Sequence, residues 1–212
     1  MVAETTSLSE INQRSGINKE LADEFKTILA KKLIFTKFQP IVCLTTGDIV
    51  GYEALSRGPE ASIFENPAYL FEIAEMLVLV EDLDMICREK AILNASKLPL
   101  DTKSTKLFIN IDAASLAYQK HDKGKTLYLI EKYGLKIDNV VLEITERAFI
   151  KDSMAFFDAL AHYQSQGFSI AIDDLGSGNA GLRLISETNP HIVKIDKFLI
   201  ENVDKSFKKQ AI

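Results

Sequence analysis

Short apolar runs alternate with amphipathic stretches through most of this chain of 212 residues. The runs are rich in β-branched and aromatic residues and stop at glycine or polar positions, as β-strands do. They predict strands at 33–44, 49–55, 106–111, 139–145, 168–173 and 192–195. From the third strand onward the segments between strands follow helical spacing, and this alternation predicts βα units in a largely parallel sheet.

The first two strands are joined too closely to lie parallel. Only Thr45, Thr46, Gly47 and Asp48 separate them, whereas parallel neighbours need a much longer crossover. The sequence therefore predicts an antiparallel hairpin at the start of the sheet.

The N-terminal part of the chain is expected to precede the main domain. Residues 1–17 are polar and lack periodicity, which suggests a lead-in or a linker. Apolar residues at helical spacing then predict an amphipathic helix over 19–32, which either docks on the main domain or joins it to a partner domain. We therefore divide the chain into an N-terminal segment, 1–32, and a main domain, 33–212.

Proline and glycine mark the helix boundaries between the strands. Asn66 followed by Pro67 predicts a helix start, because the missing N–H of proline costs nothing at the first helical position. Helical sequence continues to about Asn94, with a break near Val80. Further helices are expected up to Gly134, over 152–166 with a stop at Gly167, near 179–188, and from about Lys197 onward.

Polar residues of catalytic types gather at the strand ends, which favours a barrel over an open sheet. A complete (β/α) barrel has eight strands, and the sequence predicts only six. The chain stops at Ile212 within helical sequence, without cap or turn residues. The expected fold class is α/β, a (β/α) barrel whose last strands are missing.

Net charge, cysteine content and the lack of long apolar runs limit the functional classes and the cellular location that we expect. The formal net charge of −5 argues against a general nucleic-acid-binding protein, although metal ions can still mediate the binding of an anionic ligand. Cys43 and Cys87 are the only cysteines, which favours thiols in a reducing compartment over a disulfide scaffold. The sequence shows no signal peptide and no membrane-spanning run, so we expect a cytoplasmic protein without a membrane partner.

Five of the apolar runs end in, or just before, side chains that suit a divalent cation or a phosphate. These side chains are Glu53, Asn110, Glu143, Asp173 with Asp174, and Lys194. Because the carboxyl ends of parallel strands converge on one rim, we expect these groups to meet there. An all-oxygen site suits Mg²⁺ or Mn²⁺, and two such ions can activate a water for attack on a phosphodiester.

Each of these residues also fits a structural role when it is taken alone. Glu53 suits a strand end at the surface, and Asn110 suits a turn. Asp173 and Asp174 suit the cap of the following helix. Lys194 is harder to explain in this way, because lysine is rarely buried without a partner in an apolar run such as IVKID.

Two further charged residues lie close to this set in sequence. Arg57, shortly after Glu53, suits either a phosphate fork or a surface charge. Glu146, shortly after Glu143, could anchor a neighbouring loop by accepting backbone N–H groups. The segment 174–181 lacks the lysine of a P-loop and the spacing of a dinucleotide fingerprint, so neither motif is expected.

Taken in order, six sequence blocks resemble the motifs of the EAL domain family. They are FQPIV (38–42), GDIVGYEALSR (47–57), FIN (108–110), LEITE (142–146), IDDLGSG (172–178) and VKID (193–196). The resemblance runs from about Leu33 to Ile212, and Glu53-Ala54-Leu55 is the motif that names the family. EAL domains are bacterial cyclic di-GMP phosphodiesterases and their non-catalytic relatives.

The resemblance implies a modified TIM barrel with one antiparallel strand. It also implies hydrolysis of cyclic di-GMP to linear pGpG with two Mg²⁺ or Mn²⁺ ions. The positions that match the metal ligands of the family are Glu53, Asn110, Glu143, Asp173 and, for the second metal, Asp174.

The remaining matches concern catalysis, substrate binding and loop support. Lys194 matches the lysine at the catalytic water, and with Glu53 and Asp174 it completes the expected catalytic set. Gln39 and Arg57 match positions near the substrate. Glu146 matches the glutamate that holds the loop after Asp174.

The chain departs from the family pattern in two places. Leu175 replaces a phenylalanine and residues 179–181 replace a Tyr-Ser-Ser run, in a loop that couples metal binding to dimerisation in the family. The family also continues past the lysine block with a further metal-site glutamate and a glutamine, and this chain has neither block.

These departures leave three interpretations open. The chain is part of an active phosphodiesterase, a module that binds cyclic di-GMP without cleaving it, or an interaction module that binds no nucleotide. The expected partners are cyclic di-GMP and either a second copy of the chain or an upstream signalling domain. A partner chain or a downstream segment would supply the missing strands.

Overall fold

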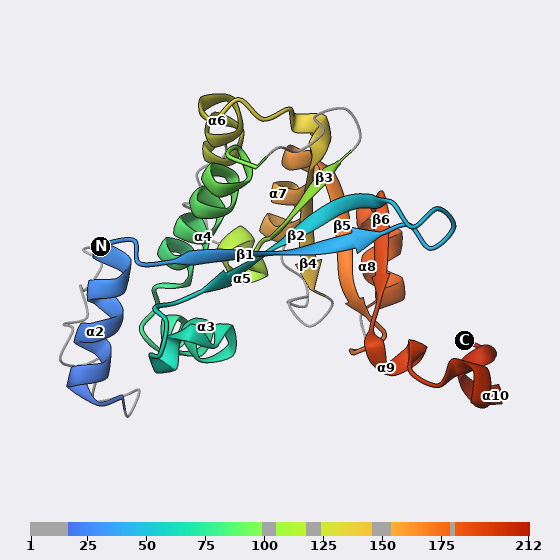
Figure 1. Ribbon diagram of the computed structural model, residues 1–212, viewed down its shortest axis with the longest axis horizontal. Coiled ribbons are helices and arrows are strands. Elements are labelled where there is room, and N and C mark those ends of the chain that lie inside the picture. The colour runs from blue at the N-terminus through green and yellow to red at the C-terminus, as the bar shows by residue number, and fades with distance from the viewer. Residues whose placement is uncertain (1–16, 99–104, 118–123, 146–153, 179–180) are drawn as a thin grey trace.

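The computed structural model describes residues 17–98, 105–117, 124–145, 154–178 and 181–212 (Figure 1). The strands are β1 (Phe35–Val42), β2 (Ile49–Arg57), β3 (Lys106–Asn110), β4 (Val140–Thr145), β5 (Ser169–Leu175) and β6 (Ile192–Ile195). The α-helices are α2 (Lys19–Ala30), α3 (Pro67–Met76), α4 (Val80–Ala95), α5 (Ala113–Ala117), α6 (Lys125–Lys132), α7 (Met154–Ser165), α8 (Gly181–Thr188), α9 (Lys197–Ile200) and α10 (Phe207–Gln210). Short 3-10 helices lie at η1 (Ile63–Glu65), η2 (Ile137–Asn139) and η4 (Val203–Lys205).

The six strands form one sheet whose order follows the chain from β1 to β6. β1 and β2 pair antiparallel, and every later pair is parallel, which confirms both predictions from the sequence. The hairpin turn closes through a backbone hydrogen bond from Cys43 N to Asp48 O and places Gly47 at φ +78°, where glycine is favoured. Within the described part of the chain, β1 and β6 are the edges of the sheet.

Helices cover one face of the sheet. Alternate residues of β3, β4 and β5, such as Ile109, Leu142 and Ile172, are buried against apolar residues of α4, α6, α7 and α8. The opposite face carries a smaller apolar cluster of Phe108, Val141 and Ala171, with Ile41 and Ile192 packed beside it. We call this opposite face the inner face.

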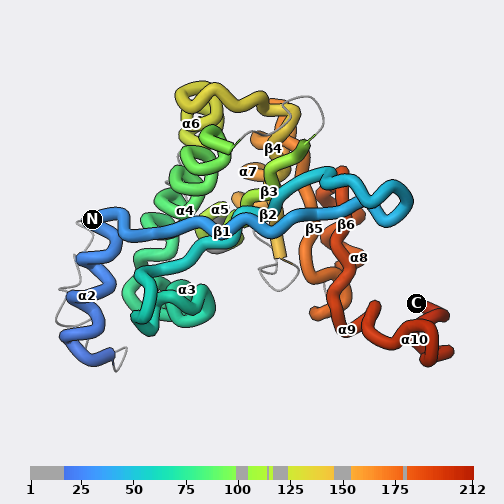
Figure 2. The backbone as a smooth tube through the Cα atoms, viewed as in Figure 1, coloured from blue at the N-terminus to red at the C-terminus, as the bar shows by residue number. Residues whose placement is uncertain are grey.

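Helix α2 packs on the rest of the fold. Its buried residues share one apolar cluster with residues of α3 and α4, and the Phe25 ring lies 5.7 Å from the Phe64 ring between centroids. Figure 2 shows α2 and α10 at opposite ends of the long axis of the molecule. Of the described helices, none is both long enough and apolar enough to cross a membrane.

The predicted start of α3 is confirmed. The Asn66 side chain accepts a hydrogen bond of 2.9 Å from Ala68 N, and Pro67 occupies the first turn. The expected break falls between α3 and α4, where Val78 adopts φ +56°.

The helix expected from about Lys197 onward begins at that residue, as predicted, but it is interrupted after one turn. The chain leaves the helix at Ile200, because Glu201 is extended and Asn202 is left-handed. Phe198 is 69% exposed and Phe207 is 90% exposed, so apolar burial does little to hold a continuous helix there. The expected lead-in lies almost wholly outside the described residues, and the helix expected from 152 is described from Met154.

Candidate metal and phosphate site

The polar residues at the strand ends share the inner face of the sheet. Glu53 lies two positions after Gly51 on β2, and Asn110 and Glu143 are direct neighbours in the register of β3 and β4. Glu143 in turn pairs with Ala171, two residues before Asp173 on β5. Successive side chains of a strand alternate between faces, so this register carries these polar groups to one side of the sheet.

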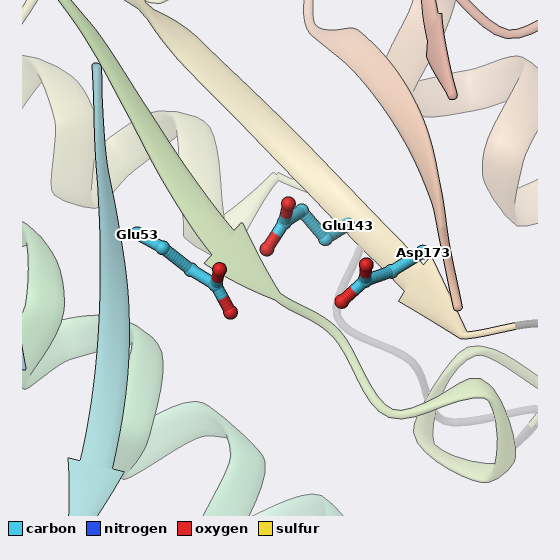
Figure 3. Close-up of side chains that lie close together, drawn as sticks. All are labelled: Glu53, Glu143 and Asp173. Atoms are coloured by element: carbon cyan, nitrogen blue, oxygen red, sulfur yellow. The ribbon is translucent and has the colours of Figure 1, made fainter. Parts of the chain in front are cut away.

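Three carboxylates meet at this point. Each of Glu53, Glu143 and Asp173 offers an oxygen that lies within 4.8 Å of the oxygens offered by the other two. Figure 3 shows the three side chains pointing toward one another from β2, β4 and β5. Glu143 is fully buried, whereas the side chains of Glu53 and Asp173 are 17% and 16% exposed. Like charges at this separation repel one another unless cations neutralise them.

Lys194 on β6 supplies a positive charge to the cluster. Its Nζ atom lies 2.9 Å from Glu53 Oε2, 2.7 Å from Glu143 Oε1 and 3.1 Å from Asp173 Oδ2. Burial opposes the charge of the ammonium, but the carboxylates of Glu143 and Glu53 outweigh burial and raise the pKa of Lys194. The lysine is therefore a fixed cation at the site.

Glu143 carries the strongest sign that the site is built for a cation. Burial raises the pKa of this carboxyl from 4.5 to about 7, even though Lys194 acts in the opposite direction. Within the described part of the chain, the Lys194 ammonium, 2.7 Å from Oε1, is the only donor in contact with the carboxylate, and Oε2 has no hydrogen-bond partner. A buried carboxylate with an oxygen left without a donor fits the role of a metal ligand.

A β-bulge determines how the side chains of Asp173 and Asp174 are oriented. The register of β5 on β6 shifts by one residue between Ile172 and Leu175, and Asp174 inside this bulge adopts φ +54°. Asp173 remains on the inner face, while Leu175 packs against the core beneath the helices. Asp174 N donates a hydrogen bond of 2.9 Å to Asp173 Oδ1, which fixes the orientation of that carboxylate.

The other predicted site residues lie around this cluster. Asn110 is half-buried at the end of β3 and lines a cavity of about 240 Å³. Arg57 lines the same cavity and a second hollow of about 670 Å³ next to α3, and its Nη1 donates to Ser56 O at 2.7 Å. Gln39 is exposed on β1, directly opposite Glu53. Asp174 is not one of the three converging carboxylates, and Glu146 lies outside the described residues.

Sequence reasoning missed a buried charge behind this site. Asp84 of α4 lines the same cavity as Asn110 and pairs with Arg88 one helical turn later. The signal was present, because a charged pair four residues apart on the apolar face of a helix has to be buried.

Comparisons with known proteins place this geometry in context. The family model of the EAL domain matches residues 21–212. A cyclic di-GMP phosphodiesterase of Pseudomonas aeruginosa is 28% identical over 181 residues, which cover 82% of this chain and 30% of that protein. The blue light- and temperature-regulated antirepressor BluF of Escherichia coli is 29% identical over 175 residues, which cover 82% of this chain and 42% of that protein.

A solved structure agrees with the fold. BlrP1 of Klebsiella pneumoniae, in a complex with manganese and cy-diGMP, superposes with a TM-score of 0.74 and 29% sequence identity. The match covers 84% of this chain and 44% of that chain. The chain therefore spans less than half the length of each of these three proteins.

Proposed function

The chain belongs to the EAL domain family, and from this membership and the geometry of the rim we propose that it hydrolyses cyclic di-GMP to linear pGpG. One observation carries the proposal more than any other. Glu53, Glu143 and Asp173 converge from three strands on one point of the inner face, and within the described residues the most buried of them, Glu143, has only the Lys194 ammonium as a donor. Phosphodiesters are cleaved at sites of this chemical kind.

We assign the metal ligands to the residues that present oxygen atoms at the rim. They are Glu53, Asn110, Glu143 and Asp173, with Asp174 for a second ion. An oxygen-only set suits Mg²⁺ or Mn²⁺. When bound, a pair of such ions would polarise a phosphodiester oxygen and make a coordinated water more acidic.

Other side chains of the protein would hold the substrate and stabilise the negative charge that develops during the reaction. Lys194, fixed among three carboxylates, offers an ammonium beside the attacking water or a phosphate oxygen. Arg57, which lines the two hollows and donates to Ser56 O through Nη1, would hold a phosphate through its guanidinium. Gln39 on the exposed side of β1 would contact a base, and Glu146 would anchor the loop after Asp174.

The test is incubation of the 212-residue chain with cyclic di-GMP and Mn²⁺, with linear pGpG followed by chromatography. We expect product that disappears when a chelator is added. Glu53→Ala should abolish turnover and weaken Mn²⁺ binding, because it removes one of the three converging carboxylates. Glu60→Ala, at an exposed glutamate just beyond the same strand, is the matched control and should leave both unchanged. Turnover that survives Glu53→Ala would overturn the assignment of the metal site.

A second candidate is a module that binds cyclic di-GMP or a protein without hydrolysis. It is favoured by BluF, a relative whose name describes an antirepressor. Binding of cyclic di-GMP in the presence of Ca²⁺, measured by calorimetry, combined with the absence of product in Mn²⁺, would support it. Both cysteines are free thiols, and we propose the cytoplasm as the place of action.

A further inference from the structure

A fully buried ion pair lies on the helix side of the sheet. The side chains of Asp84 and Arg88 are 2% and 1% exposed, and Arg88 Nη2 donates to Asp84 Oδ2 at 2.6 Å. Taking two charges out of water is costly, and apolar residues of similar volume often stabilise a fold equally well or better. The net stability that such a pair provides therefore explains little of its presence.

The acidic end of this pair holds the loop that follows β3. Asp84 Oδ1 accepts a hydrogen bond of 3.2 Å from Asp112 N, and Asp84 Oδ2 accepts one of 3.0 Å from Ser115 Oγ. Asp112 in turn caps α5 by accepting a hydrogen bond of 3.1 Å from Ser115 N. One carboxylate thus fixes both ends of the turn from Asp112 to Ser115.

This loop begins directly at the metal site proposed above. Asn110 is the last residue of β3, and the next residue, Ile111, donates its N–H to Glu143 O at 2.9 Å. Asp84 and Asn110 line the same cavity of about 240 Å³. The open space means that packing alone constrains this side of the loop less than a filled core would.

The basic end of the pair is tied to the outer helices. Arg88 Nη1 donates to Thr126 Oγ1 of α6 at 2.7 Å and to Tyr163 Oη of α7 at 2.9 Å. Asp84 is therefore held by Arg88, and Arg88 is held by two further helices. The whole chain of contacts leads from the helix layer to Asp112, two residues after Asn110.

We propose that Asp84 and Arg88 are positioning residues that orient the loop after β3, and through it the Asn110 amide, toward the bound metal. The inference rests on the proposed function, because it needs a metal at the carboxylate cluster. Residues that hold metal ligands in place contribute to metal affinity, and their substitution typically weakens metal binding by about 10- to 100-fold. We expect a loss of this order when Asp84 and Arg88 are replaced.

The experiment measures the affinity of the full 212-residue chain for Mn²⁺ by electron paramagnetic resonance of the free ion. The double variant Asp84→Leu/Arg88→Met removes both charges and keeps apolar volume, and we expect its Kd to rise about tenfold or more. The matched control is Thr126→Val/Tyr163→Phe, which cuts the same network at its far end and leaves the contacts from Asp84 to the loop intact. It should change the Kd by less than about twofold, because neither substituted hydroxyl contacts the loop after β3.

Ser115→Ala provides a second test that does not depend on how the double variant folds. It removes one loop contact and leaves the ion pair in place, and we expect a rise in Kd of several-fold. If the wild-type chain binds no Mn²⁺, the proposed function fails and this inference falls with it. If the wild-type chain binds Mn²⁺ and Ser115→Ala does so equally well, the positioning role alone is overturned. Equal weakening by the Asp84 variant and by the far-end control would also overturn it, because a general loss of core order would then explain both.

Discussion

The buried ion pair of Asp84 and Arg88 in α4 leads to a specific prediction about the free energy of unfolding. Asp84→Leu would leave the Arg88 guanidinium buried without its counter-charge, and its Nε atom already lacks a hydrogen-bond acceptor within the described part of the chain. Breaking a buried pair at one end costs about 3–5 kcal/mol. Arg88→Met should cost less, toward roughly 2–3 kcal/mol, because the Asp84 carboxylate keeps its hydrogen bonds from Asp112 and Ser115.

The double variant should be far more stable than the sum of the two single changes suggests. With both charges replaced by apolar residues of similar size, the cost should fall to within about 1–2 kcal/mol of the wild type. The coupling energy from the double-mutant cycle should therefore reach about 3 kcal/mol or more.

Urea unfolding in chelator, followed by circular dichroism, measures all four free energies of unfolding. The slopes should agree, so that differences in midpoint report differences in stability. Costs that simply add would refute the reasoning, because they would mean that water reaches the pair and screens it.

Three further predictions concern stability and metal. Gly58→Ala should cost about 2 kcal/mol in thermal or urea unfolding, because a Cβ would lie 2.4 Å from Phe64 O; Gly47→Ala, in open space, should cost less despite its positive φ. The raised pKa of Glu143 means that the folded, metal-free chain holds a proton that the unfolded chain releases. Its stability should fall as pH rises from 4.5 to about 7, by roughly 3 kcal/mol, and Glu143→Gln should remove most of this dependence in urea titrations. Mn²⁺ at one hundred times its Kd should stabilise the wild-type chain by about 2.7 kcal/mol at pH 8, and this gain should be absent from Glu53→Ala.

Much of the fold follows from local signals in the sequence. The four residues between the first two strands force an antiparallel pair, and strands separated by helices force parallel ones. Once the sheet order is known, period-two alternation explains why Glu53, Glu143 and Asp173 reach one face. Lys194 is predictable from a different local signal, because a lysine in an apolar run is buried and needs a counter-charge from another strand.

Other features depend on contacts that no local pattern encodes. The bulge at Asp174 arises where β5 pairs with β6, because the register there shifts by one residue while the pairing of β5 with β4 stays regular. The position of Asp84 and Arg88 on the apolar face of α4 signals their burial, but it does not reveal their partners. Tyr163, which accepts a hydrogen bond from Arg88, lies 75 residues farther along the chain, and no local pattern links the two.

Two carboxylates, Asp84 on the helix side of the sheet and Glu143 on the inner face, should respond differently when their charge is removed. The effect on the stability of the chain therefore tests their roles. A carboxylate that serves the fold, as Asp84 does, holds donors on both oxygens, so removing its charge should destabilise the chain. Within the described residues Glu143 has a donor, the Lys194 ammonium, at only one of its oxygens, and burial disfavours its charge. In chelator, Glu143→Gln should therefore raise stability above pH 7 and at the same time remove affinity for Mn²⁺. A buried structural glutamate would show a loss of stability instead, so opposite signs in the two measurements identify a group held in place for a cation.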